Sequence, residues 1–172
     1  MRAPIETDRL LLRPLTSADE PALAAILGDA ETMLWYPHPL TRDEVGEWIE
    51  RQLGRYENGS GLLGLVEKRT GELIGDCGAV WQDVEGVAEL EIGYHVKRQL
   101  WNRGFATEAA KATIDDAFRR IGAGTVISMI RPGNGASRRV AEKNGLTLDR
   151  VVFWHDYQHC VYRLSKKRNE DE

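Results

Sequence analysis

The chain has 172 residues, of which 42% are hydrophobic, and its formal net charge at pH 7 is −4. This size suits one domain with its own core, residues 1–166, followed by a charged tail, residues 167–172, that we expect to be disordered. No apolar run reaches the roughly 20 residues of a membrane span, and the start lacks the apolar stretch of a signal peptide, so we expect a cytoplasmic protein without a membrane partner. The acidic balance offers no general attraction to nucleic acid, which we exclude as a partner.

The chain contains only two cysteines, Cys77 and Cys160. They lie far apart, without the spacing of a zinc site or of a disulfide framework. We therefore expect two ordinary buried thiols and no metal.

The first third of the chain predicts a strand followed by two helices. Residues 9–15 form a short apolar run that Pro14 ends. Ser17 and Glu20 stand at capping-box spacing before the first helix, and Thr41 and Glu44 stand at the same spacing before the second. The segment MLWYPHPL between the helices is broken by two prolines and is predicted to be a loop.

The rest of the chain alternates between strands and helices. Turns at residues 70–71 and 85–86 separate three consecutive antiparallel strands, which a helix over residues 106–121 follows. A strand over residues 124–130, a short helix that Gly145 ends, and two final strands complete the prediction. The expected fold class is α/β, a single domain with a mixed, mostly antiparallel sheet of about seven strands flanked by about four helices.

The segment WNRGFAT places small residues where the helix over residues 106–121 begins. The start of a helix leaves backbone N–H groups unpaired at the positive end of the helix dipole, so a pyrophosphate is a plausible ligand. Gly104 and Ala106 keep side chains out of its way, and Thr107 adds a hydroxyl. Glycine and alanine are equally common as simple turn and packing residues, and neither GxGxxG nor GxxxxGK[ST] is present.

Three stretches together resemble a known family: TDRLLLRPL, EIGYHVKRQLWNRGFATEA and IRPGNGASRRVAEKNGL. They are similar in order and separation to the GNAT superfamily of acyl-CoA-dependent N-acyltransferases. The branch with the ribosomal-protein-alanine acetyltransferases, the RimJ/RimL type, is the most similar. The resemblance implies an N-acetyltransferase with the GNAT fold. Such an enzyme uses acetyl-CoA as cosubstrate and transfers the acetyl group to a primary amine.

The resemblance also implies which residues hold acetyl-CoA. The family's pyrophosphate loop, Q/R-x-x-G-x-G/A, falls on residues 101–106, where Trp101 departs from the first position. Its implied contacts are Asn102, Arg103, Gly104, Phe105, Ala106 and Thr107. The backbone of His95 and Val96 would pair with the pantetheine arm, as an added strand would. Asn134 and Ser137 match the family's N-x-x-S motif, although from the residues alone they read as a turn residue and a helix-start hydroxyl.

Amide formation from a thioester requires a neutral amine, a proton acceptor and a proton for the leaving thiolate. The alternation in AELEIGYHV places Glu89, Glu91 and His95 on one face of a strand, with core residues on the other. By position in the family, Glu91 is the expected base, directly or through a water, and Ser137 the expected acid. Glu89 is the second candidate for the base, and either carboxylate could equally belong to a solvated strand face.

The acceptor amine is less constrained by the sequence. Trp35 and Tyr36 in the proline-broken loop, Trp154 near the C-terminus and Glu89 are the expected substrate contacts, although tryptophan and tyrosine also cover sheet edges. The resemblance favours a protein or peptide N-terminal amine. A polyamine, an aminoglycoside or an amino-acid-like amine remains an alternative, as does a non-catalytic acyl-CoA-binding module. A homodimer is possible.

Overall fold

The computed structural model describes residues 2–167, and one eight-stranded sheet runs through the whole of this part. The strands are β1 (Ile5–Glu6), β2 (Leu10–Arg13), β3 (Gly61–Glu67), β4 (Leu73–Val84), β5 (Val87–Val96), β6 (Thr125–Ile130), β7 (Thr147–Trp154) and β8 (Tyr157–Ser165). The helices are α1 (Glu20–Leu27), α2 (Arg42–Tyr56), α3 (Phe105–Asp116) and α4 (Gly135–Lys143), and α3 continues to Ile121 as a π-helical turn.

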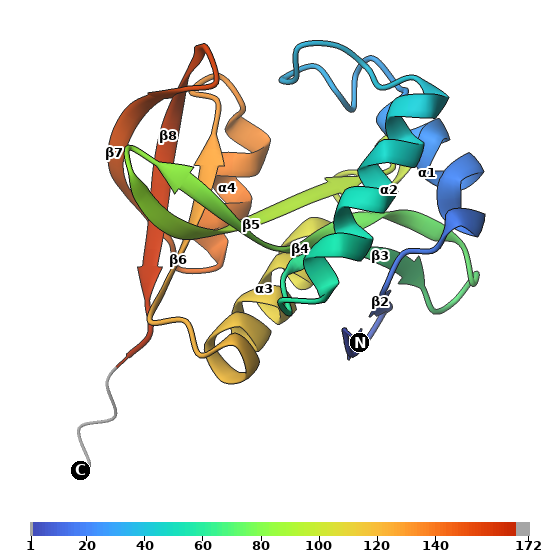
Figure 1. Cartoon of the computed structure of the whole chain (residues 1–172), viewed down its shortest axis with the longest axis horizontal. Coiled ribbons are helices and arrows are strands. Elements are labelled where there is room, and N and C mark those ends of the chain that lie inside the picture. The colour runs from blue at the N-terminus through green and yellow to red at the C-terminus, as the bar shows by residue number, and fades with distance from the viewer. Residues whose placement is uncertain (1, 168–172) are drawn as a thin grey trace.

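The strand order is β1-β2-β3-β4-β5-β6-β8-β7. All neighbouring strands are antiparallel except β5 and β6, which are parallel and pair only where Glu91 faces Ile127. Beyond Glu91 the two strands diverge, as Figure 1 shows in the middle of the molecule. The last residues of β5 therefore have a partner strand on one side only, which is the side of β4.

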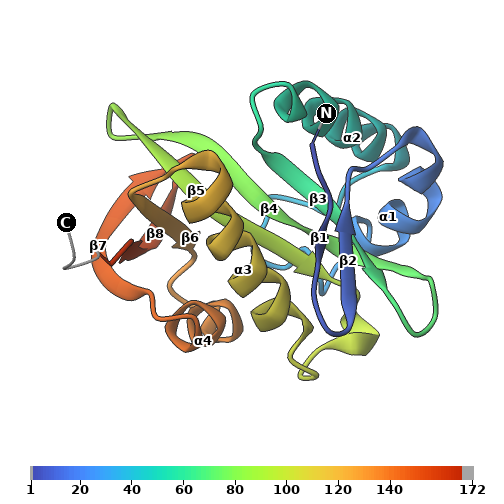
Figure 2. The ribbon, with the colours of Figure 1, turned by 90° about the horizontal axis from the view of Figure 1, so that it is seen from below.

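The helices cover the two faces of the sheet, and successive residues of β4 show which helix lies on which face. The Asp76 carboxylate accepts a hydrogen bond from the Trp48 indole of α2 at 2.9 Å, and the Cys77 thiol lies 3.3 Å from the Thr113 hydroxyl of α3. Because side chains alternate along a strand, α1 and α2 cover one face and α3 covers the other, with α4 beside it. Figure 2 shows this arrangement from below.

The predicted architecture is confirmed, with two corrections at the N-terminus. The sheet has eight strands because β1, only two residues long, pairs with β2 and is too short to give a periodic signal. The capping box before α1 is formed by Thr16 and Asp19, whose carboxylate accepts from the Thr16 N–H at 2.8 Å, one residue earlier than predicted. The usual capping-box pattern has glutamate or glutamine at this position, so an aspartate there does not match it.

The predictions for the start of α2, the end of α4 and the two cysteines are confirmed by the structure. The second capping box is formed by Thr41 and Glu44, and Gly145 follows α4 with a left-handed φ of 87°. Cys77 and Cys160 are both free thiols in the core. No helix within residues 2–167 is long and apolar enough to cross a membrane. The predicted disordered tail lies outside the described residues except for Lys167.

Candidate active site

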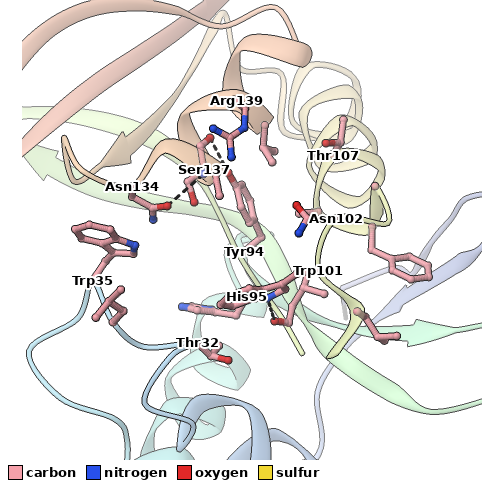
Figure 3. Close-up of a pocket in the computed structure, with 18 of the residues that line it drawn as sticks. Thr32, Trp35, Tyr94, His95, Trp101, Asn102, Thr107, Asn134, Ser137 and Arg139 are labelled. Atoms are coloured by element: carbon pink, nitrogen blue, oxygen red, sulfur yellow. Dashed lines mark hydrogen bonds between the residues drawn. The ribbon is translucent and has the colours of Figure 1, made fainter. Parts of the chain in front are cut away.

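A cleft of about 710 Å³ opens where β5 and β6 diverge, and Figure 3 shows it in close-up. One end of the cleft is formed by the start of α3 and by α4: Asn102, Gly104, Phe105, Ala106, Thr107, Asn134, Ala136, Ser137, Arg139, Val140 and Lys143. The other end is formed by the loop between α1 and α2: Glu31, Thr32, Leu34, Trp35 and Tyr36. Tyr94, His95 and Val96 of β5 line the cleft between these two ends.

The end of β5 exposes backbone groups to the cleft. Lys97 donates its N–H to the Ile74 carbonyl of β4, and hydrogen bonding in an antiparallel ladder alternates from residue to residue. The backbone of His95 therefore points toward β4, while the backbone of Tyr94 and Val96 points toward the open side. In agreement, the Val96 carbonyl accepts from the Trp101 indole at 2.7 Å. The Val96 N–H and the Tyr94 backbone are the groups that an extended ligand can pair with, and His95 contributes its side chain.

The segment before α3 presents unpaired backbone N–H groups. Within residues 2–167, no protein acceptor is found for the six N–H groups of residues 102–107, and the first intrahelical bond runs from Glu108 N–H to Gly104 O at 3.0 Å. Asn102 and Gly104 have positive φ values of 61° and 81°, which turn successive N–H groups to the same side. Such a concave run of donors at a helix start is suited to bind an anion.

The connection between β1 and β2, residues 7–9, holds this segment in place. The Arg9 guanidinium donates to the Arg103 carbonyl at 2.9 Å and pairs with the Glu108 carboxylate at 2.7 Å. Glu108 also accepts from the Thr7 hydroxyl at 2.7 Å. Although partial burial alone raises the pKa of Glu108, the hydrogen bonds from Thr7 and Arg9 lower it overall. The glutamate is therefore held as an anion between the β1–β2 connection and the helix.

The start of α4 is fixed by Asn134 and by Tyr94. The Asn134 side chain caps the helix by accepting from the Ser137 N–H at 3.2 Å, and the Tyr94 hydroxyl donates to the Ser137 carbonyl at 3.1 Å (Figure 3). The Ser137 hydroxyl itself has no partner within residues 2–167 and lies on the cleft wall. Two cationic side chains of α4 also line the cleft. Arg139 lies about one turn and Lys143 about two turns after the start of the helix, and neither forms an ion pair in the described part of the chain.

The loop between α1 and α2 reaches across to the other half of the molecule. Arg131 donates to the Trp35 carbonyl at 3.2 Å, and the Trp35 ring packs against Gly133 so closely that a Cβ there would lie 2.7 Å from it. This contact places Trp35 beside Asn134 at the mouth of the cleft (Figure 3). Tyr36, the next residue, also lines the cleft.

Four residues expected at the site do not line this cleft. Glu89 pairs with Arg163 at 2.6 Å, and Trp154 donates its indole N–H to the Asp83 carbonyl at 3.0 Å. Arg103 contributes its carbonyl to Arg9. Glu91 on β5 accepts a hydrogen bond from Gln82 at 2.8 Å, and burial raises the pKa of its carboxyl.

The structure also adds residues that reasoning from the sequence missed. Tyr94 belongs to the core face of β5 by alternation, yet its hydroxyl reaches the cleft wall because β6 has moved away. Arg139 and Lys143 follow the N-x-x-S motif at helical spacing, which is a signal that the sequence did offer. No local signal in the sequence identifies Arg9, because its partner Glu108 is 99 residues away.

Comparisons with known proteins show the family of the chain. YkkB of Bacillus subtilis (strain 168) is 37% identical over 159 residues, which cover 91% of this chain and 92% of that protein. An acetyltransferase from Agrobacterium tumefaciens str. C58 has a similar structure, with a TM-score of 0.83, 31% identity and 96% of both chains covered. RimL, a ribosomal L7/L12 alpha-N-protein acetyltransferase solved in complex with coenzyme A, shares the fold with a TM-score of 0.79 at 17% identity, covering 95% of this chain and 98% of that one. The family model of the acetyltransferase (GNAT) domain matches residues 9–147, and the chain therefore belongs to the GNAT acetyltransferases.

Proposed function

We propose that this GNAT acetyltransferase transfers the acetyl group of acetyl-CoA to a primary amine, with a peptide or protein N-terminal α-amine as its acceptor. The observation that carries the proposal is the division of the cleft. Its α3–α4 end presents six unpaired N–H groups and two cations, whereas its other end presents aromatic side chains from the α1–α2 loop. One end suits a polyanion and the other suits an organic acceptor.

The residues present fit coenzyme A. The N–H groups of residues 102–107 would bind the pyrophosphate, and Arg139 and Lys143 would pair with its remaining phosphate charge. The pantetheine arm would lie along the open backbone of Tyr94 and Val96, beside Asn134 and Ser137. When bound, the thioester would supply the electrophilic acetyl carbon.

The reaction joins the amine nitrogen to the acetyl carbon and breaks the C–S bond. An ammonium substrate loses two protons in the process, while the departing thiolate gains one. Glu91, whose pKa is raised by burial, is the proposed acceptor of the ammonium proton through an intervening water. The unpartnered Ser137 hydroxyl on the cleft wall is the proposed donor to the thiolate.

The choice of acceptor rests on the aromatic end of the cleft and on the fold shared with RimL. Trp35 and Tyr36 offer flat surfaces for a peptide backbone or an apolar side chain. A small amine, such as a polyamine or an aminoglycoside, would use the same wall. We further propose that the enzyme acts in the cytoplasm, and that any homodimer leaves this cleft open.

Calorimetric titration with acetyl-CoA, followed by thiol release over a panel of peptides and small amines, tests the proposal. Binding followed by turnover on peptides supports it, and turnover on small amines alone contradicts the choice of acceptor. Failure to bind acetyl-CoA, or binding without turnover on any amine, contradicts the activity. If Glu91→Gln and Ser137→Ala both keep the wild-type kcat, the proposed proton roles are wrong. The rate enhancement would then come from the positioning of the two substrates alone.

A further inference from the structure

Three polar side chains form a continuous chain of hydrogen bonds from the interior to the cleft. The Asp76 carboxylate lies 2.7 Å from Nδ1 of His95, and Nε2 of the same imidazole lies 2.7 Å from the Tyr36 hydroxyl. Asp76 is fully buried and His95 is 7% exposed, whereas the Tyr36 residue is 42% exposed. Tyr36 and His95 both line the cleft, and Tyr36 is the most exposed of the three residues.

The partners of the imidazole determine its tautomer. Ionised carboxylates only accept hydrogen bonds, so Nδ1 carries the proton that is donated to Asp76. Nε2 then has a free lone pair and accepts from the Tyr36 hydroxyl. The remaining lone pair of the Tyr36 oxygen is available to accept a proton from a molecule in the cleft.

Surrounding elements hold the arrangement rigidly. Trp48 of α2 donates to the second oxygen of Asp76 at 2.9 Å, and its ring meets the His95 ring edge-on with centroids 5.7 Å apart. Gly75 of β4 touches the His95 carbonyl so closely that no Cβ fits there. This close approach brings the two strands together beside the histidine. Within residues 2–167, His95 is the one basic side chain that is hydrogen-bonded to the buried Asp76 carboxylate.

We propose, building on the proposed function, that Tyr36, His95 and Asp76 form a proton relay that accepts the proton released as the amine attacks the thioester. As the N–C bond forms, the amine proton passes to the Tyr36 oxygen while the Tyr36 hydroxyl proton passes to Nε2 of His95. The imidazolium that results is paired with Asp76, and it later returns its proton to solvent. The C–S bond breaks, the thiolate takes its proton from Ser137, and the Ser137 hydroxyl regains a proton from solvent, which balances the proton that the imidazolium releases.

This assignment separates two proton transfers. Glu91, through a water, takes the proton that an ammonium must lose before it can attack, and the relay takes the proton lost during attack. Tyr36 and His95 are catalytic residues in this scheme, whereas Asp76 is a positioning residue that acts through His95. The titratable groups facing His95 are Asp76 from β4, Tyr36 from the loop and Glu91 from β5, and Trp48 of α2 adds a neutral neighbour.

The location and burial of Tyr36 are consistent with this role. Burial of its hydroxyl raises the pKa of Tyr36, and the charges of Glu91 and Asp76 raise it further, so the phenol stays protonated at neutral pH. A protonated phenol can pass on one proton as it receives another. Tyr36 belongs to the same loop as Trp35, at the acceptor end of the cleft.

The geometry is tested without turnover by NMR of the protein labelled with ¹⁵N at histidine. We expect His95 in the Nδ1–H tautomer, and we expect Asp76→Asn to disturb that tautomer. An Nε2–H tautomer in the wild type would mean that the imidazole donates to Tyr36 and cannot accept from it, which overturns the relay.

The chemistry is tested by comparing kcat, KM and acetyl-CoA affinity in Tyr36→Phe, His95→Gln and Asp76→Asn. We expect kcat to fall about 100-fold or more in each, as for loss of a general base, with acetyl-CoA affinity unchanged. His38→Gln is the matched control. His38 lies on the same loop as Tyr36, pairs with Glu44 of α2 at 2.9 Å, and is not among the residues that line the cleft. Wild-type-like kcat in Tyr36→Phe and His95→Gln overturns the relay alone, whereas an inactive wild type overturns the proposed function. Tyr36→Phe changes one atom of a loop residue, so it answers the question if the buried variants fail to fold.

Assays at pH 9.5 with a peptide α-amine, whose ordinary pKa is about 8, separate the two proton transfers. The amine is then already neutral, so Glu91→Gln should recover its rate while His95→Gln should not. Equal recovery of both variants would show that His95 serves only the first transfer and would overturn the assignment.

Discussion

The Arg9 guanidinium lies over the Phe105 ring, with its central carbon 4.2 Å from the ring centre. Phe105 is the first residue of α3 and belongs to the segment that presents unpaired N–H groups. Together with the bonds to Arg103 and Glu108, this contact couples the β1–β2 connection to the segment that is proposed to bind the pyrophosphate. Cation–π and charge-assisted contacts of this kind favour one loop conformation over others.

Replacing Arg9 should therefore weaken acetyl-CoA binding although Arg9 does not line the cleft. We expect Arg9→Met to raise the Kd by about 10-fold, equivalent to about 1.4 kcal/mol. Arg69→Met is the control, since Arg69 is exposed and its one ion pair within residues 2–167 is with Glu67 at 3.5 Å. Equal Kd values for both variants, measured by calorimetry, would show that the loop keeps its shape without Arg9.

Gly104 should be essential for acetyl-CoA binding. An aspartate there would place a carboxylate among the N–H groups that bind an anion, in a backbone conformation with φ of 81° that L-residues avoid. We expect Gly104→Asp to weaken binding by at least about 100-fold, or about 2.7 kcal/mol. Gly71→Asp carries the same strain, at a φ of 72° with no atom nearby, so its retained affinity separates the binding effect from strain. Unchanged acetyl-CoA affinity in Gly104→Asp would show that acetyl-CoA binds elsewhere on the protein.

Asn134 should contribute to stability as well as to the cleft. Its side chain caps α4 by accepting from the Ser137 N–H, and removing such a cap costs about 1 kcal/mol. We expect Asn134→Ala to lower the free energy of unfolding by this amount in urea titrations, and Asn134→Ser, which keeps an oxygen acceptor, to recover most of it. No difference between the two variants would mean that the cap is not what stabilises the helix.

Glu91 should make the protein less stable as pH rises. Burial raises its pKa above the ordinary value of 4.5, so between these two values the folded state holds a proton that the unfolded state has lost. The free energy of unfolding should therefore fall across this window by up to about 1.4 kcal/mol per pH unit, and Glu91→Gln should remove that contribution. Urea titrations from pH 4 to pH 8 measure it, with the exposed Glu50→Gln as control. Parallel curves for wild type and Glu91→Gln would contradict the shift.

Cys77 should be unreactive in the folded protein. Burial raises the pKa of its thiol to about 12, and both cysteines lie in the core. Because the thiolate is the reacting species, a disulfide reagent such as dithionitrobenzoate should label neither residue until the protein is unfolded, when it should label two. Rapid labelling of the native protein would reveal local opening around β4.

The order of elements was predictable because its signals are local. Proline, glycine and capping residues mark the boundaries of α2, α4 and the turns, and the periodicity of apolar residues distinguishes strand from helix. Failures occurred where a signal was short or substituted, as in the two-residue β1 and the Thr16–Asp19 cap. The C-terminal end of β5 shows a further limit. Alternation places Tyr94 on the core face of the strand, but Tyr94 lines the cleft because β6 diverges from β5 there.

The sequence by itself determined the fold and the run of unpaired N–H groups at residues 102–107, because the small residues and the helix start that produce this run are adjacent in the chain. Only the tertiary structure determined what surrounds the acceptor. Tyr36 lies 59 residues before His95, and Asp76 lies 19 residues before it, so no local pattern links the three. They meet because the β4–β5 register places Asp76 opposite His95 and because the loop after α1 folds across to Gly133. Such contacts depend on strand register and loop packing, which involve the whole domain rather than any one segment.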